Sequence, residues 1–331
     1  MSEGSVIMRR IIRIGEKSTG ITIPREWLNS IGADLGSLVR VSISGRSIIV
    51  SPMEEKETSV SEIPLDTREF SSPEAFSRIL IASYLEGLDR IVVSGDRIAI
   101  RKAFNDVFTK LPGIVLFESG ERSEFRITVD ENVMSLMAII KTLSSSSLMM
   151  FDLLDKYLST GDISHLDQLF ALDDDLDRLH FMGIRLIKKS PGMSIAEAGD
   201  LIVLIKSLEH VGDSLDRTAR FMQRIKLDER CVKTASEIFR IAREYYEKSL
   251  EAYISKDITT ALNLLSNRAR TMDNLIESVI RTTCSNELSG VLHEALNIIA
   301  ISAEIGELTA SSYAREKISM LSKGESQKLS S

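Results

Sequence analysis

From about residue 131 to residue 317, apolar residues recur with the helical period almost without a break. The interruptions are short polar stretches, one of which contains a Pro-Gly pair at 191–192. This punctuation predicts six long helices, over residues 132–158, 163–188, 194–225, 229–254, 258–282 and 287–317. Amphipathic helices must bury their apolar stripes against one another, so we expect a mostly α protein built from helical bundles.

An internal repeat divides these helices into two groups. Leu-Asp-Arg-Leu at 176–179 recurs as Met-Asp-Asn-Leu at 272–275, which is 96 residues later. Glu-His-Val-Gly-Asp-Ser-Leu at 209–215 recurs as Ala-Glu-Ile-Gly-Glu-Leu-Thr at 303–309, which is 94 residues later. The repeat predicts two tandem three-helix units followed by a flexible tail, over residues 131–226, 227–318 and 319–331.

The second helix of the first unit carries four aspartates that are not equivalent. At 100° per residue, Asp173, Asp177 and His180 fall in the middle of the apolar stripe, at positions i, i+4 and i+7. Asp174 falls on the flank and Asp175 falls opposite the core, where both are expected to be solvated. Carboxylates that face a core need a counter-charge, because an unpaired buried charge is costly.

The third helix offers a second acidic row, made of Glu209, Asp213 and Asp216, with Gly212 beside it for close helix packing. We expect no surplus of basic residues on this helix, so two facing acidic rows predict a multivalent cation between them. Oxygen ligands suit magnesium, manganese or iron, and the added imidazole leaves zinc as a candidate. The alternative is an open bundle surface on which both rows are solvated.

The second unit keeps only part of this pattern. Its candidate ligands are Asp273, Glu277 and Glu307. Apolar residues replace the counterparts of Asp173, His180, Glu209 and Asp216, so we expect a thinner metal site there, with Ala269, Ile276, Ala303 and Ala310 at those positions.

The first 53 residues form a basic head on an acidic body. They carry seven basic and four acidic residues, whereas the rest of the chain has a net charge of −10. The pattern predicts a strand at 10–14, a turn, a strand at 21–23, a short helix after Pro24 and a hairpin, whose strands are 38–43 and 47–52. So small a unit has a thin core of its own and is plausible where two chains interleave.

The order of elements, with Arg10, Ile12, Ser18, Pro24 and Trp27 at motif positions, resembles the AbrB/SpoVT family of swapped-hairpin DNA-binding domains. The resemblance implies a homodimer that binds double-stranded DNA. It implies phosphate contacts from basic residues of the first strand and loop, namely Arg9, Arg10, Arg13, Lys17 and Arg25. The alternative is a solvated basic face on a module that only dimerises.

Between head and helices, residues 54–71 are polar and predict a linker, and residues 72–130 predict a small α/β segment. The segment shows no nucleotide-binding fingerprint or catalytic cluster. A spacer is the preferred interpretation, and a ligand-sensing module is the alternative.

Two segments of the body resemble the PhoU family of phosphate-uptake regulators. They are the acidic stretch 173–181 and Glu-His-Val-Gly-Asp-Ser-Leu-Asp-Arg-Thr-Ala at 209–219. The order of an AbrB-like head, a small middle segment and a PhoU-like body is similar to archaeal PhoU-type regulators. The resemblance implies a metal-binding body, a regulatory role in phosphate uptake, and phosphate-transporter or sensor-kinase components as partners.

We therefore expect a transcriptional regulator of phosphate homeostasis and not an enzyme. One alternative is a metal-binding adaptor that acts without DNA. Another is a carboxylate-bridged metalloenzyme, which is disfavoured because such bundles usually carry Glu-x-x-His pairs on two helices. Cys231 and Cys284 lack metal-type spacing and are expected to be free thiols in the cytoplasm. No secretory signal core is recognised, and no run is expected to cross a bilayer.

Overall fold

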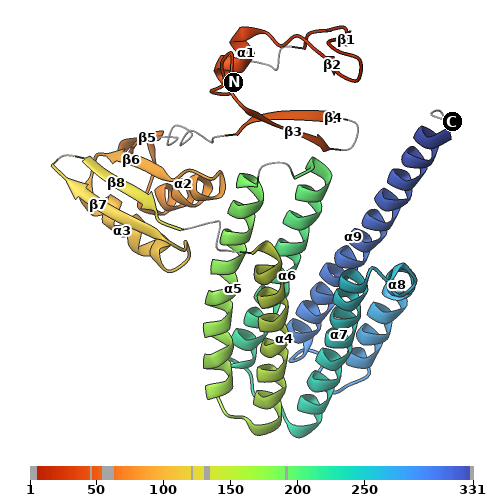
Figure 1. The fold of residues 1–331 in the computed structure, drawn as a ribbon. Coiled ribbons are helices and arrows are strands. Elements are labelled where there is room, and N and C mark those ends of the chain that lie inside the picture. Colours follow the sequence, from red (N-terminus) through yellow and green to blue (C-terminus); the bar gives the residue numbers. More distant parts are fainter. Residues whose placement is uncertain are drawn as a thin grey trace. The chain divides into compact units, whose positions relative to one another are not determined.

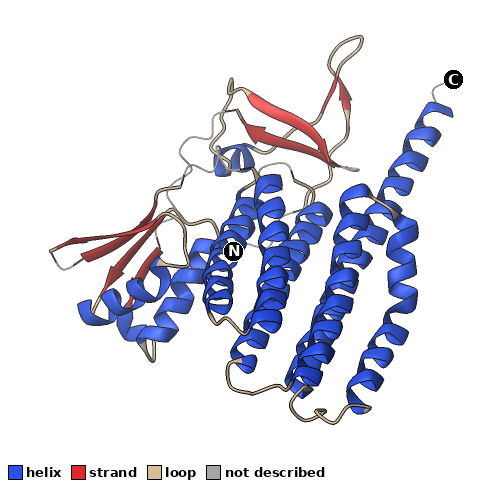
Figure 2. Ribbon diagram, turned by 90° about the horizontal axis from the view of Figure 1, so that it is seen from below, coloured by secondary structure: helices blue, strands red, loops and turns tan. Residues whose placement is uncertain are grey.

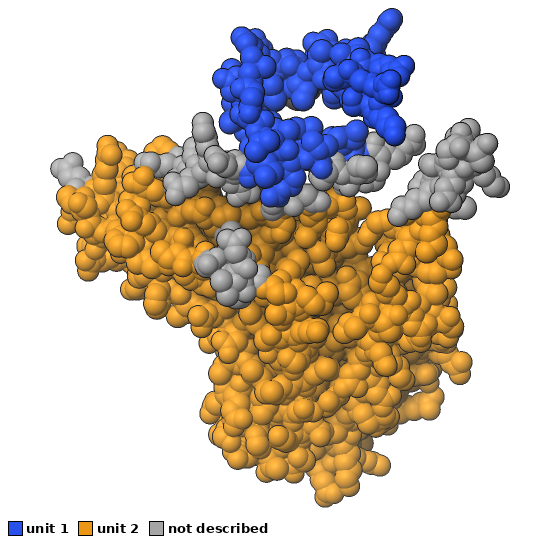
Figure 3. Space-filling view, viewed as in Figure 1, with its two compact units in different colours: residues 1–60 blue, residues 61–331 orange. Residues whose placement is uncertain are grey.

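The computed structural model describes residues 6–44, 47–53, 63–120, 122–129, 135–190 and 193–328. The chain divides into two compact units, Met1–Val60 and Ser61–Ser331, which Figure 3 shows in different colours.

The first unit contains two small antiparallel pairs and one short helix. Strand β1 (Ile12–Arg13) pairs with β2 (Thr19–Gly20), α1 spans Arg25–Ser30, and β3 (Val39–Ser44) pairs with β4 (Ser47–Pro52). The predicted helix after Pro24 and the predicted hairpin are confirmed. The predicted strand at 21–23 is wrong: the strand that pairs with β1 is Thr19–Gly20, and residues 21–23 are not in a strand. The amide of Ile14 bonds the carbonyl of Ser18 at 3.0 Å, which closes the turn just before residue 19.

This first unit has almost no core of its own. Among its residues with described burial, Ala33 alone is buried. Large apolar side chains are exposed along β1, α1 and the hairpin, including Ile12, Trp27, Val41 and Ile48. So many exposed apolar side chains in so small a unit are typical of a surface that another chain covers.

The second unit opens with a two-layer α/β portion. Its elements are β5 (Ile63–Asp66), a 3-10 turn (Thr67–Glu69), α2 (Pro73–Leu85), β6 (Arg90–Ser94), α3 (Arg97–Phe108), β7 (Ile114–Ser119) and β8 (Arg122–Ile127). The strand order is β5-β6-β8-β7, with β5 parallel to β6 and the other pairs antiparallel. Figure 2 shows the two helices against one face of this sheet. The core between them includes Phe76, Leu80, Ile91, Val93 and Phe125.

This sheet corrects the predicted linker. Residues 63–66 of the expected linker 54–71 form β5, which pairs with β6 from Ile63 to Asp66. Residues 54–62 lie outside the described part of the chain.

Six long helices follow, as predicted (Figure 1). They are α4 (Leu136–Thr160), α5 (Ser164–Lys189), α6 (Ile195–Met222), α7 (Glu229–Ser255), α8 (Ile258–Ile280) and α9 (Ser289–Lys328). Helices α4–α6 pack together, as do α7–α9, and α6 also packs along α9. One continuous apolar core runs through both groups. Helix α9 continues to Lys328, so the predicted flexible tail at 319–331 is helical over most of its length.

Helix α4 and the cysteines differ from expectation. By length and composition α4 could cross a membrane, yet Leu143, Met150 and Leu154 are buried in the helical core.

Cys231, in the first turn of α7, forms a disulfide with Cys284, which precedes α9. The sequence separation of 53 residues gave no sign of this pairing, since only the fold brings the two positions together.

The α/β portion is fixed to α5 by a buried arginine. Arg185 is fully buried, and its guanidinium donates to the carbonyls of Tyr84 and Leu88 at 2.9 Å each. It also pairs with the carboxylate of Asp89 and lies over the Tyr84 ring. Lys189 bonds Asp89 from the next turn of α5 at 2.9 Å. These contacts hold α2 against the acidic helix.

Candidate metal centre on helices α5 and α6

The structure places the aspartates of α5 as the helical wheel predicts. Asp173 and Asp177 are half-buried and His180 is buried, whereas Asp174 and Asp175 are exposed. The difference follows from the angle of each residue around α5, because the buried face of this helix is set by Leu169, Leu176 and Ile184.

Gly212 brings the second acidic row close to the first. A Cβ atom at this position would lie 2.4 Å from Cδ1 of Leu176 and 3.7 Å from Oδ1 of Asp173. A Cβ atom would therefore have to displace the side chain of Leu176, so glycine permits this close approach of α6 to α5. On either side of Gly212, Glu209 is nearly buried, Asp213 is partly buried and Asp216 is buried.

Basic side chains neutralise several of these carboxylates, which corrects the expectation that none was available. Lys110, just beyond α3, lies 3.3 Å from Asp177. Two arginines of α6 pair with aspartates one turn before them, Arg217 with Asp213 at 3.3 Å and Arg220 with Asp216 at 2.6 Å. The two i, i+4 pairs on α6 could have been read from the sequence. The contact from Lys110 could not, because it spans 67 residues.

His180 and Glu209 are the least satisfied pair of the site. Nδ1 of His180 lies 3.5 Å from Oε1 of Glu209, and both side chains are nearly buried. Among the described residues, neither ring nitrogen of His180 has a hydrogen-bond partner, and neither has Oε2 of Glu209. Nε2 of His210 lies 3.6 Å from Oε2 of Glu209, beyond hydrogen-bond distance. Buried polar atoms are nearly always bonded, so these atoms have unused capacity to bind a ligand.

The remaining carboxylates repel one another. Burial, then the charges of Asp216, Asp213 and Asp177, raise the pKa of Asp173 to about 7. Burial and the charge of Glu209 also raise the pKa of Asp213, although Arg217 acts in the opposite direction. Burial opposes ionisation of Glu209 as well, but the combined attraction of His180, His210 and Lys206 outweighs it and lowers the pKa of Glu209. A cation placed among these groups would relieve the repulsion.

The predicted ligands do not converge on one point in this arrangement. No three of them have ligand atoms within 4.8 Å of one another in the described part of the chain. Asp228, Cys231 and Cys284 do meet that distance, but their sulfurs are bonded to each other and Asp228 accepts the amide of Cys231 at 2.8 Å. The acidic rows would thus have to release Lys110, Arg217 or Arg220 before closing around an ion.

The second unit does not repeat this geometry. Asp273, Glu277 and Glu307 are all exposed, and Glu277 pairs with Arg281 at 2.7 Å. Gly306, the counterpart of Gly212, faces Leu265 rather than Met272, the counterpart of Leu176. At this glycine, the contacting residue of α8 therefore lies seven positions before the one that the repeat predicts. The weaker site that the repeat predicted is not assembled by these three residues.

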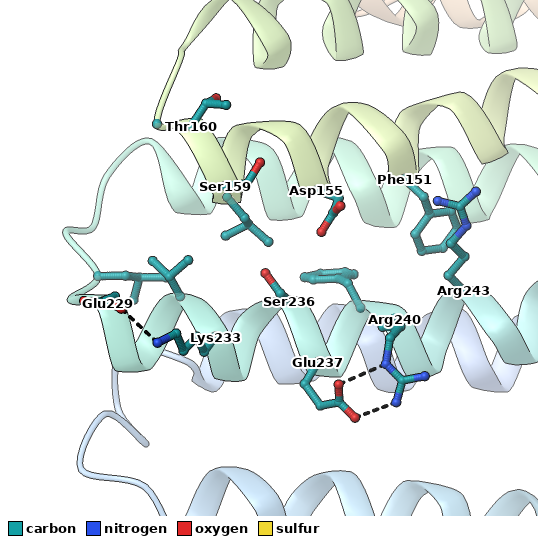
Figure 4. Close-up of a pocket in the computed structure, with 15 residues that line it drawn as sticks. Phe151, Asp155, Ser159, Thr160, Glu229, Lys233, Ser236, Glu237, Arg240 and Arg243 are labelled. Atoms are coloured by element: carbon teal, nitrogen blue, oxygen red, sulfur yellow. Dashed lines mark hydrogen bonds and ion pairs between the residues drawn. The ribbon is translucent and has the colours of Figure 1, made fainter.

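A cavity of about 800 Å³ lies away from the acidic rows, between α4 and α7 (Figure 4). Phe151 and Phe239 contribute apolar surface to it. Its basic side chains are already paired, Lys233 with Glu229 at 2.8 Å, Arg240 with Glu237 at 2.6 Å and Arg243 with Asp152. We therefore do not assign ligand chemistry to this cavity.

In the first unit, the residues expected to contact DNA are all exposed. They are Arg9, Arg10, Arg13, Lys17 and Arg25. Arg13 donates to the carbonyl of Gly15 at 3.1 Å, which orients its side chain along the turn between β1 and β2. Among the described residues, none of the five forms an ion pair with an acid, so their charges are free for phosphate groups.

Comparison with known proteins adds little. No protein-family model and no curated protein matches the chain. A matching solved structure is the crystal structure of PhoU from Pseudomonas aeruginosa, with 15% sequence identity and a TM-score of 0.42. The match covers 53% of this chain and 91% of that chain. A similarity at this level carries no conclusion about family or function.

Proposed function

We propose that this protein is a DNA-binding regulator whose first unit dimerises on duplex DNA and whose helical body binds a multivalent metal ion. The observation that carries the DNA part is the composition of the first unit's surface. The unit exposes five basic side chains that form no ion pair among the described residues, and it also exposes large apolar side chains such as Ile12 and Trp27. A second copy would cover the apolar residues and double the positive field toward the phosphates.

The metal part is supported by both ring nitrogens of His180 and by Oε2 of Glu209, which have no hydrogen-bond partner among the described residues. Asp177 and Asp213 complete a set with one imidazole and three carboxylates, which suits iron, manganese or zinc. Beyond Asp177 and Asp213, Asp173 would extend the row on α5 and Asp216 the row on α6. When bound, the ion would supply the positive charge that Lys110, Arg217 and Arg220 supply in its absence.

The proposed role in phosphate homeostasis rests on the resemblance of residues 173–181 and 209–219 to the PhoU family. It places the protein in the cytoplasm, with a phosphate-transporter or sensor-kinase component as a further partner. Transcript levels of phosphate-uptake genes in cells lacking the protein test this part. Unchanged transcripts in both phosphate-rich and phosphate-poor medium would argue against it.

A gel shift with duplex DNA at low and raised salt tests the DNA part directly. Wild-type protein should bind with strong salt dependence, and Arg10→Gln with Arg13→Gln should weaken binding and flatten the salt slope. Arg122→Gln, an exposed position in the second unit, is the matched control. The first unit does not contact DNA through these residues if the double variant has the DNA affinity of the wild type, or if the affinity does not change with salt concentration. Sedimentation analysis should show a dimer.

A further inference from the structure

A second candidate site lies beside the acidic rows, in a cleft of about 680 Å³ where α2 and α3 meet α5. Its apolar lining comes from three helices, with Ile81, Leu85, Val107 and Phe181 among the residues that form it. Ligand pockets for small organic molecules are usually of this size and are mostly apolar, with a few placed polar groups.

The charged groups of the cleft favour an anion. Arg78 is exposed at the cleft and forms no ion pair among the described residues. Lys110 lines the same cleft and is about half exposed.

Each of the two acidic side chains in the cleft has a hydrogen-bonding or ion-pair partner. Glu74 is held by Lys102 at 2.5 Å. Asp106 accepts a hydrogen bond from Ser77 at 3.2 Å and is exposed, so solvent screens its charge.

We propose that this cleft binds a small organic anion with an apolar body. The apolar body lies against Val107 and Phe181, and the anionic group is held between Arg78 and Lys110. A guanidinium and an ammonium together give charge-assisted hydrogen bonds to a carboxylate or a phosphate.

Two contacts connect this cleft to the acidic rows. Lys110 is the partner of Asp177 at 3.3 Å, and the ring of Phe181 stacks on His180 at 5.1 Å. An anion in the cleft draws Lys110 away from Asp177, which leaves that carboxylate free to bind a cation. Anion and metal therefore strengthen each other's binding, by the same factor in both directions. This coupling rests on the proposed metal centre, whereas the cleft itself does not.

The cleft is tested by calorimetric titration of the full chain with octanoate. We expect binding that Arg78→Gln weakens about tenfold, the loss typical of one charge-assisted contact. Ala82→Phe should abolish it by filling the cleft, and this exposed position tolerates a larger side chain. Arg122→Gln should have no effect. Equal octanoate affinity in wild type and Ala82→Phe would overturn the cleft, and equal affinity for the neutral octanamide would overturn the anion preference.

The coupling has one readout without metal and one with it. In metal-free protein, octanoate should shift the imidazole NMR signals of His180, which His180→Gln assigns among the four histidines. Saturating octanoate should also raise Mn²⁺ affinity about fivefold or more. Lys110→Gln should raise Mn²⁺ affinity by itself and remove the octanoate effect. Octanoate binding that leaves both readouts unchanged overturns the coupling. A chain that binds octanoate but no Mn²⁺ overturns the metal centre and leaves the cleft standing.

Discussion

Nδ1 of His180 on α5 lies 3.5 Å from Oε1 of Glu209 on α6, and both side chains are almost completely buried. This pair is separate from the ion pairs that Lys110, Arg217 and Arg220 form with the aspartates of the two rows. His180→Phe keeps the volume of the ring but removes both nitrogens.

We expect His180→Phe to weaken Mn²⁺ binding at least about tenfold, measured by calorimetry, as is common when a residue that binds or orients a metal is lost. The matched control is Asp175→Asn, which removes an exposed carboxylate of the same helix. Similar Mn²⁺ affinity in wild type and His180→Phe would place any metal elsewhere.

Asp173 should make the stability of the metal-free protein depend on pH. Its pKa is about 7 in the folded state, above the value near 3.8 expected when unfolded. The folded state therefore binds the proton more tightly, so this residue's stabilising contribution is complete below about pH 4 and is lost as the pH rises through 7. Asp173→Asn should flatten the fall in unfolding free energy between pH 5 and 8, measured with urea and a chelator at each of about four pH values. Asp174→Asn, an exposed neighbour, should leave that slope as it is.

The sequence predicted which side chains of α5 face the core, because helical geometry fixes the angle of each residue around the helix axis. Asp173, Asp177 and His180 lie toward the core and Asp175 lies in water, as their spacing requires. The helix after Pro24 and the six long helices could also be predicted, since the local spacing of apolar residues and the helix-breaking residues between them determine where each helix lies.

What the sequence did not show depends on contacts between distant segments. Lys110 reaches Asp177 because the α/β portion packs on α5, where Arg185 and Lys189 bond it. The repeat places Gly306 opposite Met272, and its two offsets of 96 and 94 residues do not reveal that Gly306 faces Leu265 instead. The unsatisfied atoms of His180 also required the packing of α6. Arg217 and Arg220, by contrast, are one turn from their partners and were missed although the signal was local.

Gly212 and Gly306 should respond in opposite ways to the same substitution. Gly212→Ala places a Cβ 2.4 Å from Cδ1 of Leu176, a fully buried side chain, so we expect a loss of about 1–3 kcal/mol in unfolding free energy. Gly306→Ala meets no atom closer than 3.5 Å and should gain up to about 1 kcal/mol from helix propensity. Urea denaturation of the two variants measures both. Equal losses in unfolding free energy would mean that α5 and α6 are no closer at Gly212 than α8 and α9 are at Gly306.

Arg185 should be the main support of the α/β portion on α5. Arg185→Met leaves the carbonyls of Tyr84 and Leu88 without this donor, and we expect a loss of about 3–5 kcal/mol. Hydrogen exchange should increase at the C-terminal end of α2 before it increases in the helical core. Arg178→Met is the control, because its ion pair with Asp175 is exposed and 3.9 Å long. A change below about 0.5 kcal/mol is expected there.

The disulfide between Cys231 and Cys284 should stabilise the second group of helices in particular. It joins the first turn of α7 to the segment before α9 and closes a loop that contains the whole of α8. Replacing both cysteines with serine should lower the unfolding free energy by about 2–4 kcal/mol, because the unfolded chain regains the freedom of that loop. Reduction of the wild-type protein should give the same loss, and the double variant should not respond to the reductant. Hydrogen exchange should rise most in α8, where only Ala261, Leu275 and Val279 are buried. Equal stability of oxidised and reduced wild type would show that the bridge adds no constraint beyond the packing of α7 on α9.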